Sequence, residues 1–435
     1  MCPEICGMLC IIFIRRCRKV NTKLAWNTEF ITESQRLVFT KGITGRLAQG
    51  KIILIAGGEE IPTDFCSNIQ GLQELERCFN IRYVGYYNTD GKSHFVNHPY
   101  NFRGICNGHF TDTVRIYYKI EDFISHVERH ILTLMFGDLE DAYSKIRLAK
   151  PYIISFGIDE EFFCSKEDFE EAYKRDNRFT NDEKHKLIYY YDLVSLLMHF
   201  YNIFRNIEMR FFSVQIELSN IVNKLVAEKH NRFLDEIQIN RFSEIWIQSW
   251  FADKIYSMYM DNIIGMRALL DLITKVAYEI VNPPPSFDRP VKMSSNGIYY
   301  GDCNRINNKK FNQILWDQTV FGKVKRYEEL SYIRNEFVHN SSLSPYPRIY
   351  VGKGTSCVNN NEIFYACCFM WDIGNTGKPT RWVNRYRFYG NQTCIDEYIL
   401  NWLVEIYIDV EKTIDLLEDY LCSLPGQQTT DSTVR

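Results

Sequence analysis

Residues 395–422 read IDEYILNWLVEIYIDVEKTIDLLEDYLC, and their pattern indicates the fold class of the C-terminal half. The apolar side chains recur at steps of three and four residues. Because an α-helix completes one turn about every 3.6 residues, side chains with this spacing lie on one face. They are Ile399, Leu403, Ile406, Val410, Leu417 and Leu421. A second run with the same spacing extends from Tyr259 to Ile273, and the two apolar faces predict a helical bundle.

The predicted helical domain spans residues 180–422. It begins with Thr180, which is followed three residues later by Glu183, as in a helix-capping box. Pro283 to Pro285 must end a helix, because proline has no backbone N–H and its ring clashes with the preceding turn. The segment from Ser344 to Gly390 has a β-like composition, so we expect a small β-containing insertion within the helical domain.

Residues 1–150 have a different pattern. Lys51 to Ala56 and Ile81 to Tyr87 are short runs rich in β-branched and aromatic residues, and turn-forming glycines follow both. Val114 to Tyr118 predicts a further strand, and Asp122 to Leu148 predicts one helix. We therefore expect an α+β module of unknown role before the helical domain.

The composition is that of a folded protein with two domains. The chain has 435 residues, of which 46% are hydrophobic and 15% aromatic, so disorder is excluded for most of it. A formal net charge of −3 gives no overall attraction for nucleic acid, and any RNA contact must come from a local basic patch. The polar residues 423–435 predict a disordered tail.

Cysteine usage and the N-terminus predict a cytoplasmic protein. The 14 cysteines include no CxxC pair, which favours reduced thiols over a zinc or redox motif. The apolar run from Gly7 to Ile14 is far shorter than the ~20 residues of a membrane span. Its basic residues follow the run, whereas a signal peptide places them before it. A lipid anchor remains an alternative because the segment contains Cys2, Cys6, Cys10 and Cys17.

The segment with candidate chemistry is YEELSYIRNEFVHN, residues 327–340. The spacing of Leu330, Ile333 and Phe337 predicts a helix with these three side chains buried. On such a helix His339 points about 180° away from Leu330, and Asn335 points about 140° away from it. Arg334 lies near the edge of the apolar stripe, about 140° around the axis from His339. These polar side chains therefore need another surface to face, which a second copy of the helix would provide.

The sequence R-N-E-F-V-H at residues 334–339 resembles the Arg-polar-x-x-x-His motif of HEPN domains, a family of all-helical bundles found in toxin, anti-phage and RNA-surveillance ribonucleases. The resemblance covers residues 180–422. It implies a mainly α fold, with a C-terminal HEPN-like bundle that carries the small β-containing insertion and follows the α+β module. It assigns the catalytic roles to Arg334, Asn335 and His339. It also implies a homodimer with a composite active site, a defence or toxin role, and a regulatory or antitoxin partner.

These residue types suit metal-independent cleavage of RNA. The 2′-hydroxyl of RNA is the nucleophile, so the enzyme needs proton transfer and stabilisation of charge on the phosphate oxygens. His339 would transfer the proton, Arg334 would bind the phosphate, and Asn335 would orient either one. No metal and no cofactor are required. The alternatives are a non-catalytic HEPN scaffold that binds RNA or a protein partner, and a helix end at which His339 is only a cap.

Two basic segments are candidates for contact with the RNA substrate. Residues 381–389 interleave basic and aromatic residues, and a strand would separate the two kinds onto opposite faces. We expect the basic face to bind phosphates and the aromatic face to pack on the bundle. The basic residues are Arg381, Arg385 and Arg387, and the aromatic residues are Trp382, Tyr386 and Phe388. The second segment precedes the motif and contains Lys323, Lys325 and Arg326. Solvated faces without RNA explain both segments equally well.

Overall fold

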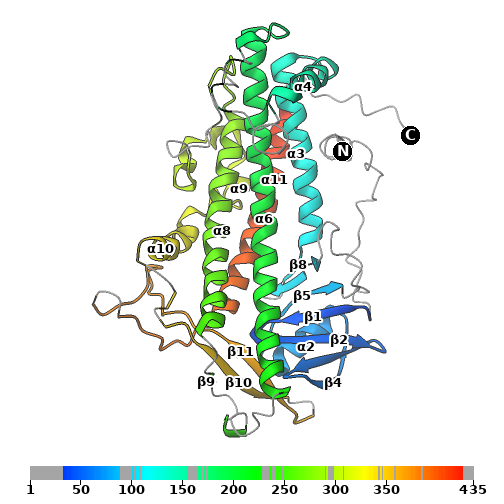
Figure 1. Ribbon diagram of the computed structural model, residues 1–435, viewed down its shortest axis with the longest axis vertical. Helices are drawn as coiled ribbons and strands as arrows, with labels where there is room; N and C mark the ends of the chain where they lie inside the picture. Colours follow the sequence, from blue (N-terminus) through cyan, green and yellow to red (C-terminus); the bar gives the residue numbers. More distant parts are fainter. Residues whose placement is uncertain are drawn as a thin grey trace.

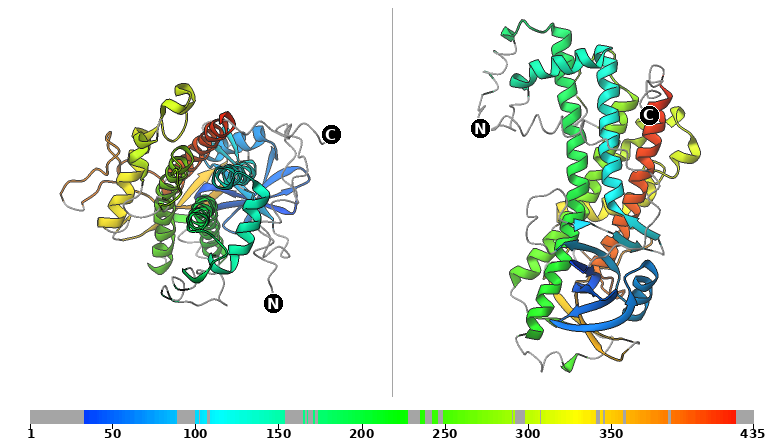
Figure 2. Two further views of the ribbon diagram at one scale, coloured as in Figure 1. Left: turned by 90° about the horizontal axis from the view of Figure 1, so that it is seen from above. Right: turned by 90° about the vertical axis from the view of Figure 1, so that its right-hand side faces the viewer.

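A computed structural model shows long helices standing side by side, with a β-sheet at one end of them (Figures 1 and 2). The chain is mainly helical. The structure describes residues 33–88, 100–101, 103–106, 109–153, 165, 167, 171, 174–227, 235–237, 242–245, 249–289, 291, 298–306, 308–340, 343–344, 346–356, 359–383 and 386–424. The predictions for the N-terminal cysteines and apolar run, and for the tail beyond residue 424, lie outside these residues.

Four long helices form the bundle, and their buried side chains belong to one continuous core (Figure 1). They are α3 (Thr113–Phe136), α6 (Asn181–Ala227), α8 (Ser249–Val281) and α11 (Ile395–Ser423). The shorter helices are α2 (Ile69–Phe79), α4 (Leu139–Ile153), α9 (Gln313–Trp316) and α10 (Val324–Asn340). Within the described ranges, no helix combines the length and apolar character that a membrane span needs.

The helix boundaries predicted for the bundle are confirmed. Glu183 N donates to the Thr180 hydroxyl over 3.2 Å, and Thr180 N donates to the Glu183 carboxylate over 2.8 Å. This reciprocal capping box begins α6. Helix α8 ends at Val281, just before Pro283, and α11 covers the amphipathic run from Ile395.

The N-terminal module contains a six-stranded antiparallel sheet in the order β4-β3-β2-β1-β5-β6. Burial alternates along its strands, as expected when one face packs on a core. Helix α2 packs Leu72 and Leu75 into that core. The strands are β1 (Gln35–Phe39), β2 (Ile43–Ala48), β3 (Lys51–Ala56), β4 (Glu59–Cys66), β5 (Tyr83–Asn88) and β6 (Tyr100–Asn101), with a separate hairpin of β7 (Arg103–Cys106) and β8 (His109–Asp112).

Two sequence predictions for this module are wrong. The strand expected at Val114 to Tyr118 is the first part of α3, whose buried side chains follow a helical spacing on the bundle core. The single helix expected from Asp122 to Leu148 is two helices. Gly137 separates them with a φ of +79°, and the Asp138 carboxylate then accepts the Asp141 N–H over 2.8 Å as a new N-cap.

The predicted β-containing insertion is confirmed as β10 (Ile349–Thr355) and β11 (Glu362–Cys367). A third strand, β9 (Phe242–Ile245), joins this sheet and was not predicted. Ile363 and Tyr365 of β11 belong to the core of the N-terminal sheet, while α3 packs on α11. The end of the N-terminal module, expected near residue 150, lies inside helix α4. Packing between the two ends of the chain is therefore extensive.

A short 3₁₀ turn, η1 (Thr40–Gly42), joins the N-terminal sheet to the bundle. Lys41 N donates to the buried Asp396 carboxylate of α11 over 2.8 Å, and Lys41 Nζ lies 3.2 Å from Glu397 Oε1. The Ser219 hydroxyl of α6 donates to the Gly42 carbonyl. Gly42 has a φ of +75°, and an added Cβ would lie 2.8 Å from backbone of α6, so only glycine fits there.

Candidate functional site

Helix α10 forms as the motif predicts, with its apolar stripe in the bundle core. Leu330, Ile333 and Phe337 are buried, and the Phe337 ring packs edge-on against Trp371 with ring centroids 5.6 Å apart. The Tyr327 hydroxyl donates to the Asp409 carboxylate of α11 over 2.8 Å, and burial raises the pKa of that hydroxyl. These contacts fix the rotation of α10 about its axis, and with it the direction of the motif side chains.

The three predicted catalytic side chains lie on the outward part of α10. Asn335 and His339 are exposed, and Arg334 is half-buried at the edge of the stripe. At about 100° per residue, Asn335 and His339 project only about 40° apart. Arg334 Nη1 donates to Asn335 Oδ1 over 3.0 Å, so the guanidinium turns towards the side of the helix that carries His339. The structure thus brings the three side chains to one solvent-facing side.

Glu336, within the motif, anchors the following segment to α10. Its carboxylate is 6% exposed and accepts a hydrogen bond from the guanidinium of Arg387, which is 7% exposed. The Arg387 guanidinium also lies 4.2 Å from the Trp371 ring centroid. Arg381 Nη2 lies 3.8 Å from the same Glu336 carboxylate. Sequence reasoning missed this role of Glu336, although its three-residue spacing from Ile333 already placed it beside the buried stripe.

The orientation predicted for residues 381–389 is wrong. Arg381 and Arg387 pair across an isolated antiparallel bridge, and Arg387 points inward, while the aromatic side chains point outward. The physical reason is that the buried Glu336 carboxylate requires a cation, which Arg387 provides. The exposed aromatic residues are Trp382, Tyr386 and Phe388. Arg385 lies outside the described residues.

The basic residues before the motif mostly contact α11. Lys323 Nζ lies 2.7 Å from Asp409 Oδ1, and Arg326 Nη2 lies 3.0 Å from Glu405 Oε1. The Arg326 guanidinium also stacks on Trp402, 4.7 Å from the ring centroid. Lys325 is exposed. Two of the three side chains therefore already have acidic partners, which reduces the positive potential they offer to RNA.

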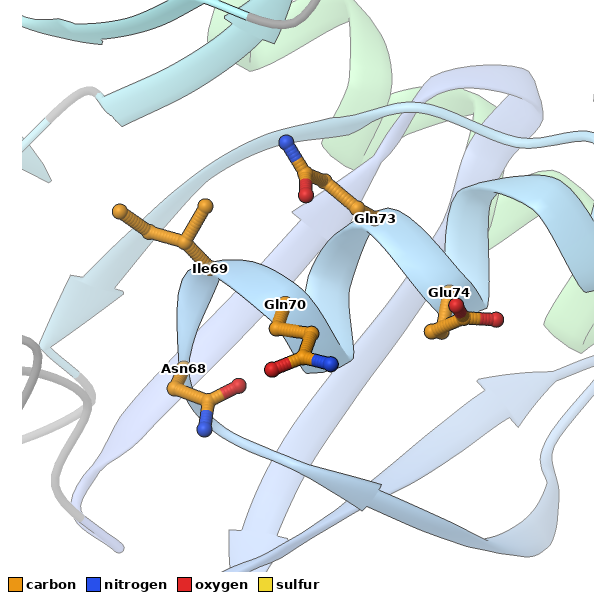
Figure 3. Close-up of a pocket in the computed structure, with 5 residues that line it drawn as sticks. All are labelled: Asn68, Ile69, Gln70, Gln73 and Glu74. Atoms are coloured by element: carbon orange, nitrogen blue, oxygen red, sulfur yellow. The ribbon is translucent and has the colours of Figure 1, made fainter.

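A concavity of about 630 Å³ lies at the N-terminal end of α2, away from α10. Figure 3 shows its lining side chains, which are mostly amides. They are Asn68, Ile69, Gln70, Gln73 and Glu74. Asn68 caps α2 by accepting the Gly71 N–H over 2.7 Å, so one lining polar group already has a structural role. None of the lining residues belongs to α10 or to residues 381–389.

Comparison of the chain with protein-family models, with curated proteins and with solved structures gave no match.

Proposed function

We propose that the chain is a metal-independent endoribonuclease of the HEPN type, with Arg334, Asn335 and His339 at its active site. The observation that supports this most directly is the Arg334–Asn335 hydrogen bond of 3.0 Å on the exposed side of α10. It turns a permanently charged phosphate-binding group towards a histidine in the last helical turn. A cation and a proton-transfer group on one accessible surface are what cleavage by the 2′-hydroxyl requires.

In the proposed reaction, the RNA 2′-oxygen attacks the adjacent phosphorus atom and the bond from phosphorus to the 5′-oxygen breaks. His339 accepts the 2′-hydroxyl proton or delivers a proton to the leaving oxygen. Arg334 stabilises the added negative charge on the non-bridging oxygens through its planar pair of N–H donors. Asn335 holds the guanidinium in place. The products are a 2′,3′-cyclic phosphate and a 5′-hydroxyl, and DNA is resistant because it lacks the nucleophile.

The proposed enzyme is a homodimer. His339 and Asn335 project away from the bundle core, so one protomer offers only one wall of an active site. Two copies of α10 facing each other would bring two histidines to one phosphate, one to accept a proton and one to donate it. The resemblance to HEPN domains implies the same arrangement, and it also suggests a defence or toxin setting.

The test is to incubate wild type, Arg334→Ala and His339→Ala with total RNA in EDTA. We expect both variants to lose activity by about 10²-fold or more, as for the loss of a general acid–base or charge-stabilising group. Cyclic phosphate ends on the wild-type products identify the attacking group. His185→Ala is the control, because His185 is an exposed histidine on α6. It should retain wild-type activity.

The competing function is a non-catalytic scaffold that binds RNA or a protein partner. It predicts no cleavage by the wild type in EDTA, with RNA still retained by the protein. Size-exclusion chromatography with light scattering establishes whether each variant is a folded dimer before its activity is compared. Cleavage that persists in His339→Ala at the wild-type rate would contradict the proposed site.

A further inference from the structure

We propose that the exposed aromatic face formed by Trp382, Tyr386 and Phe388, in the segment made of residues 380–383 and 386–389, stacks on unpaired bases of single-stranded RNA and holds the strand beside α10. This inference rests on the proposed function, since it names the kind of RNA that the site accepts. The segment is a small hairpin whose outward side chains are Trp382, Tyr386 and Phe388. Trp382 is 75% exposed and Tyr386 is 70% exposed, whereas large aromatic side chains are on average much more buried.

The backbone places these aromatic side chains on one face. Arg381 pairs with Arg387 in antiparallel register, and Trp382 N donates to the Tyr386 carbonyl over 3.0 Å. Opposed residues of an antiparallel pair project to the same side, and every second residue does so along one strand. Trp382, Tyr386 and Phe388 therefore share the solvent face, and Arg387 lies on the inner face.

Hydrogen bonds to Asp372 hold the hairpin in position. The Asp372 carboxylate accepts the backbone N–H groups of Gly390 and Asn391, each over 2.9 Å. Asp372 N donates to the Phe388 carbonyl over 2.8 Å. With the buried Arg387–Glu336 pair, these bonds fix the second leg of the hairpin on the bundle, and Thr380 N fixes the first leg by donating to the Asp372 carbonyl over 2.9 Å. A preorganised aromatic surface loses little conformational entropy when a base stacks on it.

The hairpin lies next to the motif, which its inner face contacts through Glu336. Glu336, which anchors the hairpin, precedes His339 by three residues. On a helix this corresponds to about 60° of rotation and about 4.5 Å along the axis. The hairpin is therefore anchored within one helical turn of His339, so a strand bound on its outer face passes close to the motif. The hairpin is thus placed to position the strand, and His339 to act on it.

The local charge favours a polyanion over a protein surface. Arg381 lies at the edge of the inner face, 3.8 Å from Glu336, and remains partly exposed to solvent, and Lys378 is exposed just before the hairpin. The nearby carboxylates are already occupied, since Glu336 binds Arg387 and Asp372 binds backbone N–H groups. Exposed aromatic rings with basic side chains nearby are typical of sites that bind single-stranded nucleic acid. A duplex is a poor ligand for this face because its bases are stacked on one another.

The experiment measures binding separately from cleavage. The parent is full-length His339→Ala, so the RNA stays intact, and the probe is a fluorescein-labelled oligouridylate of about twelve nucleotides. Fluorescence anisotropy gives Kd for the parent and for the parent carrying Trp382→Ala and Tyr386→Ala. We expect at least about a tenfold increase in Kd, since one aromatic stack strengthens binding by about 5- to 150-fold. A duplex of equal length should bind more weakly than the single strand to the parent.

The matched control is Tyr118→Ala, which removes an aromatic side chain that is 66% exposed on α3. It should leave Kd unchanged. Equal Kd values for parent and double variant would overturn the inference, as would no binding of the oligouridylate up to about 100 µM protein, the weak end of non-specific nucleic-acid binding. Unchanged RNA affinity with loss of the dimer would show that the hairpin contacts a second copy instead.

The two proposals fail differently. If the hairpin variant loses RNA binding while wild type does not cleave RNA, the single-strand site stands and the nuclease fails. If wild type cleaves through His339 and the hairpin variant on the wild-type background keeps both KM and kcat, the nuclease stands and the single-strand site fails. A higher KM with kcat little changed supports both.

Discussion

Asp396→Asn is expected to change how the stability of the protein depends on pH. The Asp396 side chain is completely buried at the start of α11, where one oxygen accepts Lys41 N over 2.8 Å. Its other carboxylate oxygen has no hydrogen-bond partner within the described residues. Burial, with a smaller contribution from the neighbouring Glu397 charge, raises the pKa of Asp396 from 3.8 to about 6. The ionised carboxylate is therefore destabilising in this position.

The size of the effect follows from the two pKa values. Below pH 3.8 the carboxyl is protonated in both the folded and the unfolded chain and imposes no charge penalty. As the pH rises from about 3 to above about 7, the unfolded chain ionises first, so the folded state loses about 3 kcal/mol relative to it. Asparagine cannot ionise and still accepts the Lys41 N–H. Relative to wild type, the free energy of unfolding of Asp396→Asn should therefore rise by about 3 kcal/mol between acid and neutral pH.

The assay is urea unfolding followed by tryptophan fluorescence, at pH about 3 and about 7.5, for wild type and Asp396→Asn. Only the difference between the two proteins at each pH is interpreted, since other groups titrate equally in both. Asp419→Asn, an exposed position on the same helix, should stay within about 0.5 kcal/mol of wild type at both pH values. A difference between wild type and Asp396→Asn that does not change with pH would refute the reasoning.

Three further predictions test the packing by substitution. Thr180→Ala removes the capping box of α6 and should lower the free energy of unfolding by about 1 kcal/mol, measured by urea midpoint. Gly50 has a φ of +74° with open space around it, so Gly50→Ala should lower the free energy of unfolding by about 1–2 kcal/mol. Gly42 has a φ of +75° and lies against backbone, so Gly42→Ala should lower it by more than twice as much. Equal losses would contradict the close contact at Gly42. Glu336→Ala should lose about 3–5 kcal/mol in thermal or urea unfolding because Arg387 stays buried and unpaired, and Glu336→Leu with Arg387→Leu should recover most of that loss.

The sequence predicted the long helices well because local signals coincide there. Apolar periodicity, the Thr180–Glu183 box and Pro283 all act within a few residues, so they can be recognised without knowledge of tertiary contacts. The segment from Val114 to Tyr118 failed for the opposite reason. Four of its five side chains favour strands, yet they lie in the first turns of α3, because burial of Ile116 and Tyr117 on the bundle outweighs their intrinsic preference. Gly137 was visible in the sequence, and its effect as a helix terminator was missed.

At the candidate site, the sequence predicted which residues share a helix but not what surrounds them. The buried stripe and the outward directions of Asn335 and His339 follow from helical periodicity alone. Alternation correctly separated Trp382, Tyr386 and Phe388 from Arg381 and Arg387, but the inward face was assigned to the wrong set. The reason is a contact from Arg387 to Glu336, 51 residues apart, that no local pattern indicates. Long-range ion pairs of this kind are decided by the tertiary fold.

The η1 turn has a consequence for synthesis of the chain. Lys41 contacts Asp396, which follows it by 355 residues, and the neighbouring sheet core includes Ile363 and Tyr365 of β11. At a ribosomal rate of about 5–20 residues per second, the N-terminal sheet waits roughly 20–70 s for these partners. During that interval its apolar face is available to chaperones and to other nascent chains. Translation of a messenger RNA truncated before the codon for residue 363 would release a protein fragment with this face still uncovered. The quality-control machinery should degrade that fragment rapidly.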